Sequence, residues 1–413
     1  MDLDTEMRVD GVSSAKMRDV ALRLFEYCSS RDWAGYDPYD ALNSRVFKAL
    51  PLLDVKPIRL ALTQGMKRSP LNLRGLLLVP PSQNPKGLGL FLAAVLKLRK
   101  LALIRDEELA KQLSARIEAL RSPRKDFWCW GYSFPWQTRT RLVPRGEPNL
   151  VCTTFVAEAL LDMHEEHGDD RHLRMAVSAA DYLLTDLFWT EPGANCGFSY
   201  PFPSTHSLVH NANLLAGSFL ARVYSRTGER KYLECALNVT RCAVRHQATD
   251  GSWYYGESAT QRWIDNFHTG FNLSALNKTG EYARTNEFEP SLGRGFEFYR
   301  TRFFEMDAAP KYFHDRTYPL DVHSVAQSII TLTDLQHVNG ESSGLAHSVF
   351  RWAVEHLWDE RGYFYYQKLP WGKNRICYMR WGQAWMLLAL ATLLESADAN
   401  AGYSKTRTVM SGA

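Results

Sequence analysis

The chain has no long hydrophobic run and no large charge surplus. Its longest apolar stretch near the end, residues 386–394, is under half of the roughly 20 residues that a bilayer-spanning helix needs. It has 49 Lys and Arg against 45 Asp and Glu, so the formal net charge is only +4. No block of Lys and Arg and no nucleic-acid reader motif occurs. We therefore expect no transmembrane segment and no nucleic-acid partner.

Paired cysteine motifs are also missing. The seven cysteines are scattered without a CxxC pair, and an odd, scattered set favours buried free thiols in a reducing compartment. Residues 1–17 are acidic and polar and lack the apolar core of a signal peptide. Together these features predict a cytoplasmic protein.

Several motifs that would identify a common enzyme class are absent. The sequence has no GxGxxG, Walker or GxSxG motif, no kinase set and no HExxH. It also lacks the aspartate-rich runs of terpenoid cyclases. We expect no nucleotide cofactor, no other cofactor and no catalytic metal.

Aromatic residues are abundant instead, at 12% of the chain, within a composition that is 45% hydrophobic. This is enough apolar material for a large core, and aromatic side chains are also what a pocket uses to stack on ring-shaped ligands. The length of 413 residues would allow two or three domains. The oligomeric state is left open.

An internal repeat organises the chain. Six segments begin with a polar cluster and continue as small apolar helices, and their starts are separated by 65, 57, 59, 56 and 57 residues. They begin at Asn84, Asn149, His206, Asp265, Asp321 and Tyr378. Amphipathic helices are predicted between them, over 15–28, 105–120, 170–188, 229–246, 288–304 and 343–357. The first set has the composition of enclosed helices, and the second that of helices with one wet face.

A short alternating aromatic run precedes five of the six enclosed helices, as in WGYSFPW from Trp130 and SWYYGE from Ser252. Because every enclosed helix then enters from an aromatic loop, all six should run parallel. The fold class that satisfies this is all-α: an (α/α)₆ toroid of six helical hairpins, with short β-like aromatic loops on one face. We predict a single domain over 1–400, with 30–83 as an elaborated first loop and 401–413 as a flexible C-terminal tail.

This pattern resembles the six-hairpin (α/α)₆ toroid superfamily. That superfamily includes glycoside hydrolases, unsaturated glucuronyl hydrolases, polysaccharide lyases and N-acylglucosamine 2-epimerases. Segments such as DNFHTGFNLSAL, DVHSVAQ and YMRWGQAWM are similar in texture to uncharacterised proteins associated with envelope polysaccharides. The resemblance implies carbohydrate chemistry at the loop face and does not choose the reaction.

Histidines gather at the starts of the enclosed helices. His210, His268 and His323 are candidate catalytic residues, because an imidazole can remove and return a proton near neutral pH. His206 lies four residues before His210, so the two should share a helix face, and it is a candidate for substrate binding. The alternative is that these histidines cap helices or bond to loop carbonyls.

Carboxylates offer a competing chemistry. Asp265 and Asp321 occupy equivalent positions, where they would cap helices and could also act as bases. Glu257 becomes an acid candidate if the surrounding aromatic side chains raise its pKa. Glu257 with either aspartate would then form the acid and base of an inverting hydrolase, whose carboxyl groups lie roughly 6.5–9.5 Å apart.

The remaining candidates surround the same face. Tyr378 could transfer a proton if an arginine lowered its pKa. The other residues are expected to bind an anionic or hydroxylated substrate, or to stack on its rings; they are Arg262, Arg380, Trp136, Tyr200, Trp253, Tyr255 and Trp381.

Three functions are compatible with these features. The first is a sugar epimerase, isomerase or lyase that acts by His or Tyr proton transfer on a uronic-acid or amino-sugar glycan, in polysaccharide biosynthesis or modification. The second is an inverting glycoside hydrolase using Glu257. The third is a noncatalytic glycan-binding component of a polysaccharide assembly system. Under all three functions, the expected partner is a sugar or a polysaccharide.

Overall fold

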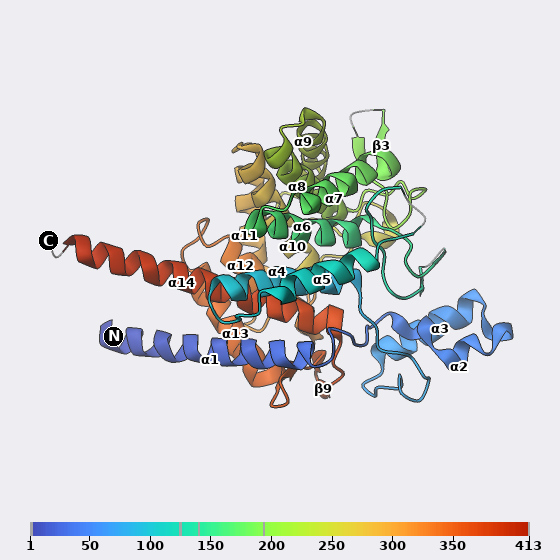
Figure 1. The fold of residues 1–413 in the computed structure, drawn as a ribbon, viewed down its shortest axis with the longest axis horizontal. Coiled ribbons are helices and arrows are strands. Elements are labelled where there is room, and N and C mark those ends of the chain that lie inside the picture. Colours follow the sequence, from blue (N-terminus) through green and yellow to red (C-terminus); the bar gives the residue numbers. More distant parts are fainter. Residues whose placement is uncertain (1–2, 124–125, 139–140, 193–194, 412–413) are drawn as a thin grey trace.

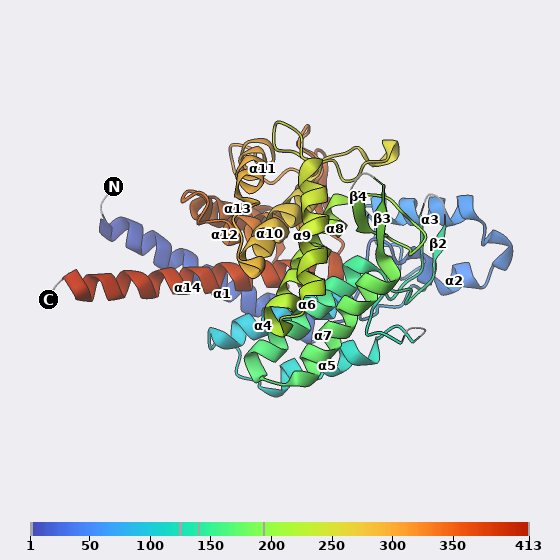
Figure 2. The ribbon, with the colours of Figure 1, turned by 90° about the horizontal axis from the view of Figure 1, so that it is seen from above.

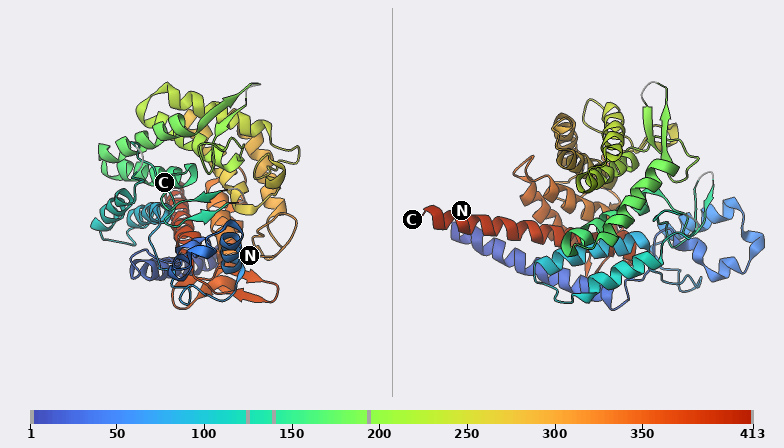
Figure 3. Two further views of the ribbon diagram at one scale, coloured as in Figure 1. Left: turned by 90° about the vertical axis from the view of Figure 1, so that its right-hand side faces the viewer. Right: turned by 45° about the horizontal axis from the view of Figure 1, so that its top comes forward.

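Six inner helices close into a ring. The computed structural model describes residues 3–123, 126–138, 141–192 and 195–411, with side chains for those between 14 and 400. Each inner helix packs on the next and the last packs on the first (Figure 3). The inner helices are α4 (Pro85–Lys100), α6 (Leu150–His167), α8 (His210–Thr227), α10 (Asn266–Ala283), α12 (Val322–Asp334) and α14 (Trp385–Ser411). The predicted toroid is confirmed.

An outer helix precedes each inner one in the chain and packs outside the ring (Figure 2). The outer helices are α1 (Leu3–Ser29), α5 (Glu108–Ala119), α7 (Asp170–Tyr182), α9 (Arg230–Arg245), α11 (Glu289–Arg302) and α13 (Ser342–Leu357). Their bounds follow the predicted amphipathic segments closely, except that α1 begins much earlier. The alternation arises because a helix that is apolar on nearly all sides must be enclosed, whereas an amphipathic helix can cover it.

Polar side chains start most of the inner helices. Asn84, Asn149, Asp265 and Asp321 each accept a hydrogen bond from a backbone N–H in the first turn, as N-caps do. The expected start at His206 is wrong, because α8 begins four residues later, at His210. At the sixth start, a π-helical turn η5 (Met379–Ala384) follows Tyr378 and leads into α14.

The loops between hairpins contain short strands. The strands are β1 (Trp136–Gln137), β2 (Leu142–Val143), β3 (Phe188–Glu191), β4 (Asn195–Phe198), β5 (Leu320–Asp321), β6 (Trp358–Asp359), β7 (Tyr363–Phe364), β8 (Gln367–Leu369) and β9 (Gly372–Asn374). They form antiparallel pairs β1–β2, β3–β4 and β6–β7 and a three-stranded sheet β5–β8–β9. A π-helical turn, η3 (Leu183–Leu187), extends α7, and a 3₁₀ turn, η4 (Ala259–Gln261), lies in the loop before α10.

Two parts extend from opposite ends of the ring (Figure 1). Within 30–83, four short elements project on the side where the inner helices begin; they are η1 (Asp40–Asn43), α2 (Arg45–Lys48), η2 (Pro51–Leu53) and α3 (Lys56–Arg68). At the other end, α1 and α14 pack on each other and continue beyond the ring. Residues 401–411, expected as a flexible tail, continue α14 as helix. The division into one domain stays a prediction.

Three aromatic side chains meet inside the ring and separate two cavities. Phe155 (α6), Phe271 (α10) and Trp385 (α14) form a closed triangle of ring contacts, with centroids 5.2–5.6 Å apart. All three line a cavity of about 360 Å³ in one half of the lumen. Phe271 also lines a second cavity, at the helix starts, and Lys86 of that second cavity lies over all three rings. We call these three residues the aromatic floor.

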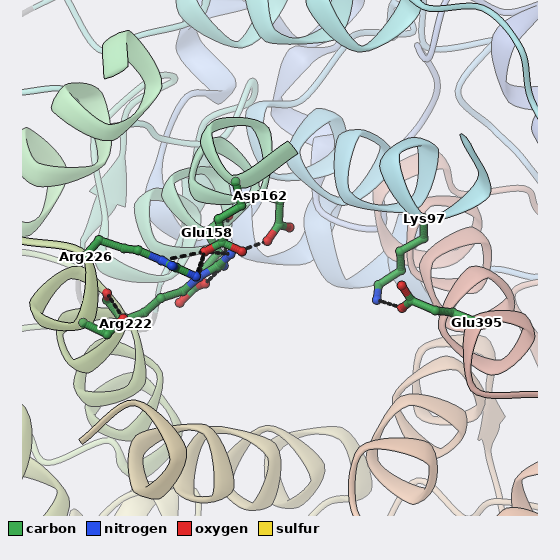
Figure 4. A network of polar contacts seen from close by, with 8 residues as sticks. Lys97, Glu158, Asp162, Arg222, Arg226 and Glu395 are labelled. Carbon is green, nitrogen blue, oxygen red and sulfur yellow. Dashed lines mark hydrogen bonds and ion pairs between the residues drawn. The ribbon is translucent and has the colours of Figure 1, made fainter. Parts of the chain in front are cut away.

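The far half of the lumen holds ion pairs rather than reactive groups (Figure 4). The Arg222 guanidinium is 2.6 Å from Asp162 and 2.9 Å from Glu165, and Lys97 pairs with Glu395. Six of the seven cysteines are buried, as predicted, and Cys377 is partly exposed. None of the described helices is long and apolar enough to cross a membrane.

Close backbone packing in the aromatic loop before α6 predicts that a side chain at Gly131 would destabilise the fold. A Cβ on Gly131 would lie 2.0 Å from the carbonyl oxygen of Glu147, so both strands of the loop would have to move apart. We expect Gly131→Ala to lower the free energy of unfolding by about 2 kcal/mol, as overpacking does. Urea unfolding measures the change. Gly344→Ala in α13 is the control, because its Cβ meets nothing within 4 Å and a helical alanine is favourable; equal losses in the two variants would contradict the packing.

Candidate active site

A cavity of about 500 Å³ lies where the inner helices begin. Residues from the first turns of five inner helices and from η5, which leads into α14, line it: Lys86, Val151, Asn211, His268, His323 and Trp381. This confirms that the six helices run parallel, because their starts meet at one place. The partial positive charge of each helix N-terminus is therefore directed at a single cavity.

The walls of the cavity are aromatic. They come from the loops before α6, α8, α10 and α12, through Tyr132, Phe134, Trp136, Tyr200, Tyr255, Trp263, Tyr312 and Phe313. Tyr39 and Lys67 from the projecting segment complete the rim. The predicted concentration of aromatic side chains at one face is thus observed, although the fifth aromatic run, 362–367, does not reach the cavity.

One carboxylate–imidazole pair faces into this cavity. Asp265 caps α10 through the backbone N–H of His268 (3.0 Å), and its other oxygen is 2.7 Å from His268 Nδ1. The indole N–H of Trp263 donates to the same oxygen at 2.9 Å. Because a carboxylate only accepts, Nδ1 carries a proton directed at Asp265, so in the neutral ring the lone pair is on Nε2. Nε2 of His268 is therefore the ring nitrogen available as a base.

The second imidazole, His323, lies deeper and has no polar contact. Neither ring nitrogen has a hydrogen-bond partner in the described protein, and the residue is 1% exposed. Phe267, Trp381 and Trp385 surround it, with ring centroids 4.6, 4.5 and 4.8 Å away. Burial, reinforced by the neighbouring Lys86 and Arg380 side chains, lowers the pKa of His323 well below its usual value. His323 is therefore a neutral imidazole with both nitrogens free for a ligand.

A buried lysine adjoins His323. The Lys86 Nζ lies 4.1, 5.6 and 5.2 Å from the ring centroids of the aromatic floor, and Lys86 is 3% exposed. Burial, followed by the neighbouring Arg380 guanidinium, lowers the pKa of Lys86 well below its usual value. The first turn of α4 thus presents an amine that loses its charge readily.

Arg380 supplies a fixed positive charge at the cavity wall. Its guanidinium is held by both oxygens of Asp37, at 2.6 and 2.9 Å. A second buried pair supports the first, because Arg74 bonds to Asp40 at 2.7 Å and to the carbonyl oxygen of Asp37 at 2.7 Å. The Asp37–Arg380 pair joins the projecting segment to η5, the turn that leads into α14, and the Arg74–Asp40 pair holds Asp37 in place from within the segment.

Two further polar atoms at the cavity lack partners. Neither Trp136 Nε1 nor Asn211 Oδ1 has a hydrogen-bond partner in the described protein, and both residues line the cavity. Buried polar groups are nearly always satisfied, so these atoms are suited to a ligand that both donates and accepts hydrogen bonds. A sugar with its hydroxyl groups is such a ligand.

The expected rise in the pKa of Glu257 is wrong. Its side chain accepts a hydrogen bond from His210 (2.7 Å), which lowers the pKa of Glu257 instead of raising it. His210 itself is fully buried, and neither residue lines the cavity. The two candidates pair with each other beside the cavity.

Asp321 and Tyr378 are enclosed as well. Asp321 accepts bonds from Gln367 (2.7 Å) and from the Trp381 indole (3.0 Å), and burial raises its pKa to about 6. It therefore positions Trp381 and does not reach the cavity. Burial also raises the pKa of Tyr378 to about 12, despite the Arg74 guanidinium 4.8 Å from its ring. The expectation of a lowered tyrosine pKa is wrong.

Three predicted binding residues lie elsewhere. His206 is not on the helix face of His210; its ring stacks on Trp189 with centroids 5.7 Å apart. Arg262 is exposed, and Trp253 is buried with its indole N–H bonded to the carbonyl oxygen of Ala243. The predicted residues that do line the cavity are Asp265, His268, His323, Arg380, Trp136, Tyr200, Tyr255 and Trp381.

Lys86 is the main residue that sequence reasoning missed. The available signal was a lysine within NPKGLGLFLAAVLKL, in the first turn of a helix that is otherwise apolar on all sides. The ion pair of Asp37 with Arg380 joins residues far apart in the chain and has no sequence signature.

The buried amine predicts a pH-dependent cost to stability. Between the lowered folded-state pKa and the unfolded value of 10.5, only the unfolded chain binds the Lys86 proton, so wild-type stability rises with pH toward 10.5. We expect Lys86→Met to be more stable than wild type near neutral pH, with a gain that disappears as the pH approaches 10.5. Urea unfolding at several pH values measures this. Lys16→Met removes an exposed lysine and is the control; a gain as large in that variant, or none in Lys86→Met, would contradict the assignment.

No protein-family model and no curated protein sequence matches the chain. Solved structures match its fold. A cellobiose 2-epimerase from Spirochaeta thermophila is 14% identical over 77% of this chain and 86% of its own, with a TM-score of 0.57. An unsaturated glucuronyl hydrolase from Streptococcus agalactiae is 12% identical over 92% and 90%, with a TM-score of 0.59. A D-mannose isomerase is 13% identical over 76% and 87%, with a TM-score of 0.55. The chain thus has the (α/α)₆ toroid fold that these sugar-acting enzymes share.

Proposed function

We propose that the chain is a sugar epimerase or isomerase that moves a proton at the carbon next to a sugar carbonyl. The observation that carries the proposal is the pair of imidazoles at one cavity, His268 oriented by Asp265 and His323 held neutral. Phe267 contacts both rings, with centroids 4.2 and 4.6 Å away. The names of the epimerase and isomerase structures with the same fold support this reaction class.

Each imidazole has a separate part in the reaction. His268 Nε2 removes the proton from the carbon next to the carbonyl of an open-chain sugar, and Asp265 stabilises the imidazolium that forms. The electron pair moves onto the carbonyl oxygen as an enediolate. A proton returned to the other face of that carbon inverts it, and one returned to the neighbouring carbon converts an aldose into a ketose. We assign the return to His323 as a relay: a neutral imidazole accepts a proton from water at one ring nitrogen as it gives up the proton on the other, and the His268 imidazolium then releases its proton to solvent.

The developing negative charge is stabilised from the cavity wall. Arg380 is fixed by Asp37 and needs no rearrangement during the reaction, which is the arrangement that stabilises a transition state most effectively. At the rim, the Lys67 ammonium bonds to the Tyr39 hydroxyl (2.6 Å) and not to a carboxylate. A cationic rim favours an anionic sugar such as a uronate. A uronic-acid or amino-sugar substrate therefore remains our prediction. Polysaccharide biosynthesis and a cytoplasmic location are separate predictions that also remain.

The hydrolase alternative has weaker support. Of Glu257, Asp265 and Asp321, only Asp265 lines the cavity, and it is bonded to His268. An inverting hydrolase needs two carboxyl groups on either side of one glycosidic bond. A lyase shares the first proton-transfer step with an epimerase and is distinguished by its product.

Incubation with sugars in D₂O tests the reaction class. We expect cellobiose, mannose or a uronic-acid oligosaccharide to gain deuterium at the carbon next to the carbonyl, without chain cleavage, as followed by NMR and mass spectrometry. An unsaturated chromophore would mean a lyase. New reducing ends without deuterium at carbon would mean a hydrolase and would exclude this proposal.

The Asp265–His268 pair predicts a large and specific effect of one substitution. Asp265→Asn keeps an oxygen to cap α10, but an amide neither fixes the Nδ1–H tautomer nor stabilises an imidazolium. We expect kcat to fall by about 10²–10⁴-fold, with little change in melting temperature.

Asp321→Asn provides a matched control. Asp321 caps the next inner helix in the same way, but it does not contact the imidazole of His323. We expect a smaller loss of kcat in this variant, through Trp381. A greater loss than in Asp265→Asn would contradict the assigned base.

A further inference from the structure

The exposed apolar side chains of the protein are concentrated in one projecting segment. Fourteen large apolar residues are exposed in the described part of the chain, and nine of them lie between residues 46 and 78. Leu52 is 93% exposed and Leu76 is 77% exposed, which is unusual for leucines in a folded chain. The nine are Val46, Leu50, Leu52, Leu53, Val55, Leu71, Leu73, Leu76 and Leu78. We call residues 44–78 the apolar lobe; it contains α2, η2 and α3 (Figure 1).

The apolar lobe is also strongly cationic. It contains seven Lys and Arg residues and a single acidic residue, Asp54, for a net charge of +6. Because the whole chain is +4, the remainder carries a net charge of −2. Arg45, Lys48, Lys56 and Arg68 are exposed, so most of this charge faces solvent together with the leucines.

The lobe is fixed to the mouth of the cavity. The Arg59 side chain donates to Gln137 on β1 (2.8 Å), and Ser44 Oγ donates to the carbonyl oxygen of Leu77 (2.6 Å), which closes the base of the lobe. Arg74 is held by Asp40 inside that base. Lys67, in the last turn of α3, lines the cavity. Whatever the lobe binds is therefore held beside the cavity opening.

We propose that the apolar lobe docks on an anionic lipid bilayer surface. Exposed leucines adjoining Lys and Arg are the combination that inserts into the headgroup boundary, where apolar groups leave water and cations meet lipid phosphates. Charge complementarity selects this occupant over a second copy of the chain, since the exposed cations of two lobes repel each other. Docked in this way, the protein presents its cavity to molecules held at the membrane surface.

Vesicle flotation tests the docking. Full-length protein is floated with vesicles of phosphatidylcholine, with or without phosphatidylglycerol. We expect wild type to bind only the anionic vesicles and to be released at high salt, because screening removes the electrostatic part. We expect Leu52→Glu, Leu76→Glu and the double variant Lys48→Glu/Lys56→Glu each to lower the partition coefficient by about tenfold or more. The leucines are exposed, so these variants should fold normally.

Two controls match these changes outside the lobe. Met306→Glu removes the most exposed apolar residue elsewhere, and Lys16→Glu/Lys111→Glu makes the same change in net charge; both should bind as wild type does. The proposal is overturned if wild type does not float with anionic vesicles, if it binds neutral vesicles equally, or if controls and lobe variants lose binding alike. It is also overturned if the protein forms a dimer that Leu52→Glu dissociates, which would make the lobe a self-association surface.

Discussion

Exclusion of water at the aromatic floor determines the chemistry of the site. Phe155, Phe271 and Trp385 close the lumen beneath the cavity, so the groups that lie on them have no access to bulk solvent from below. Burial lowers the pKa of both Lys86 and His323 for this reason, and the neighbouring Arg380 guanidinium lowers both further. In water the same side chains would be an ordinary ammonium and an imidazole with a pKa of about 6.5. The reactivity of the cavity therefore depends on the position of Lys86 and His323 within the ring of helices.

The ring could be predicted from the sequence because its signals are local. The spacing of the helix starts, the amphipathic pattern of the outer helices and the polar caps each belong to a short segment, and the structure confirms them. The closed toroid can then be inferred, because six similar hairpins follow one another with their inner helices parallel. The one wrong start, at His206, lies where the polar cluster forms a loop before α8 instead of its first turn.

The site was only partly predictable, because equivalent sequence positions have different surroundings. Asp265 and Asp321 cap neighbouring helices and each precedes a histidine, yet Asp265 bonds to an imidazole whereas Asp321 bonds to Trp381 and Gln367. Sequence spacing cannot distinguish them, since the partners of Asp321 come from distant residues. The same holds for the ion pair of Asp37 with Arg380, which are 343 residues apart. Glu257 was expected among desolvating aromatic rings, and its contact with His210 reversed the shift.

The functional account depends on one property that can be measured directly, the protonation state of the two imidazoles. Long-range proton–nitrogen NMR on protein with labelled histidines reports the charge and tautomer of each ring, and single His→Gln variants assign the signals. The account predicts that His268 is the Nδ1–H tautomer and that His323 stays neutral well below pH 6.5. A His323 that becomes charged near pH 6.5, or a His268 protonated at Nε2 with a bare Nδ1, would contradict it.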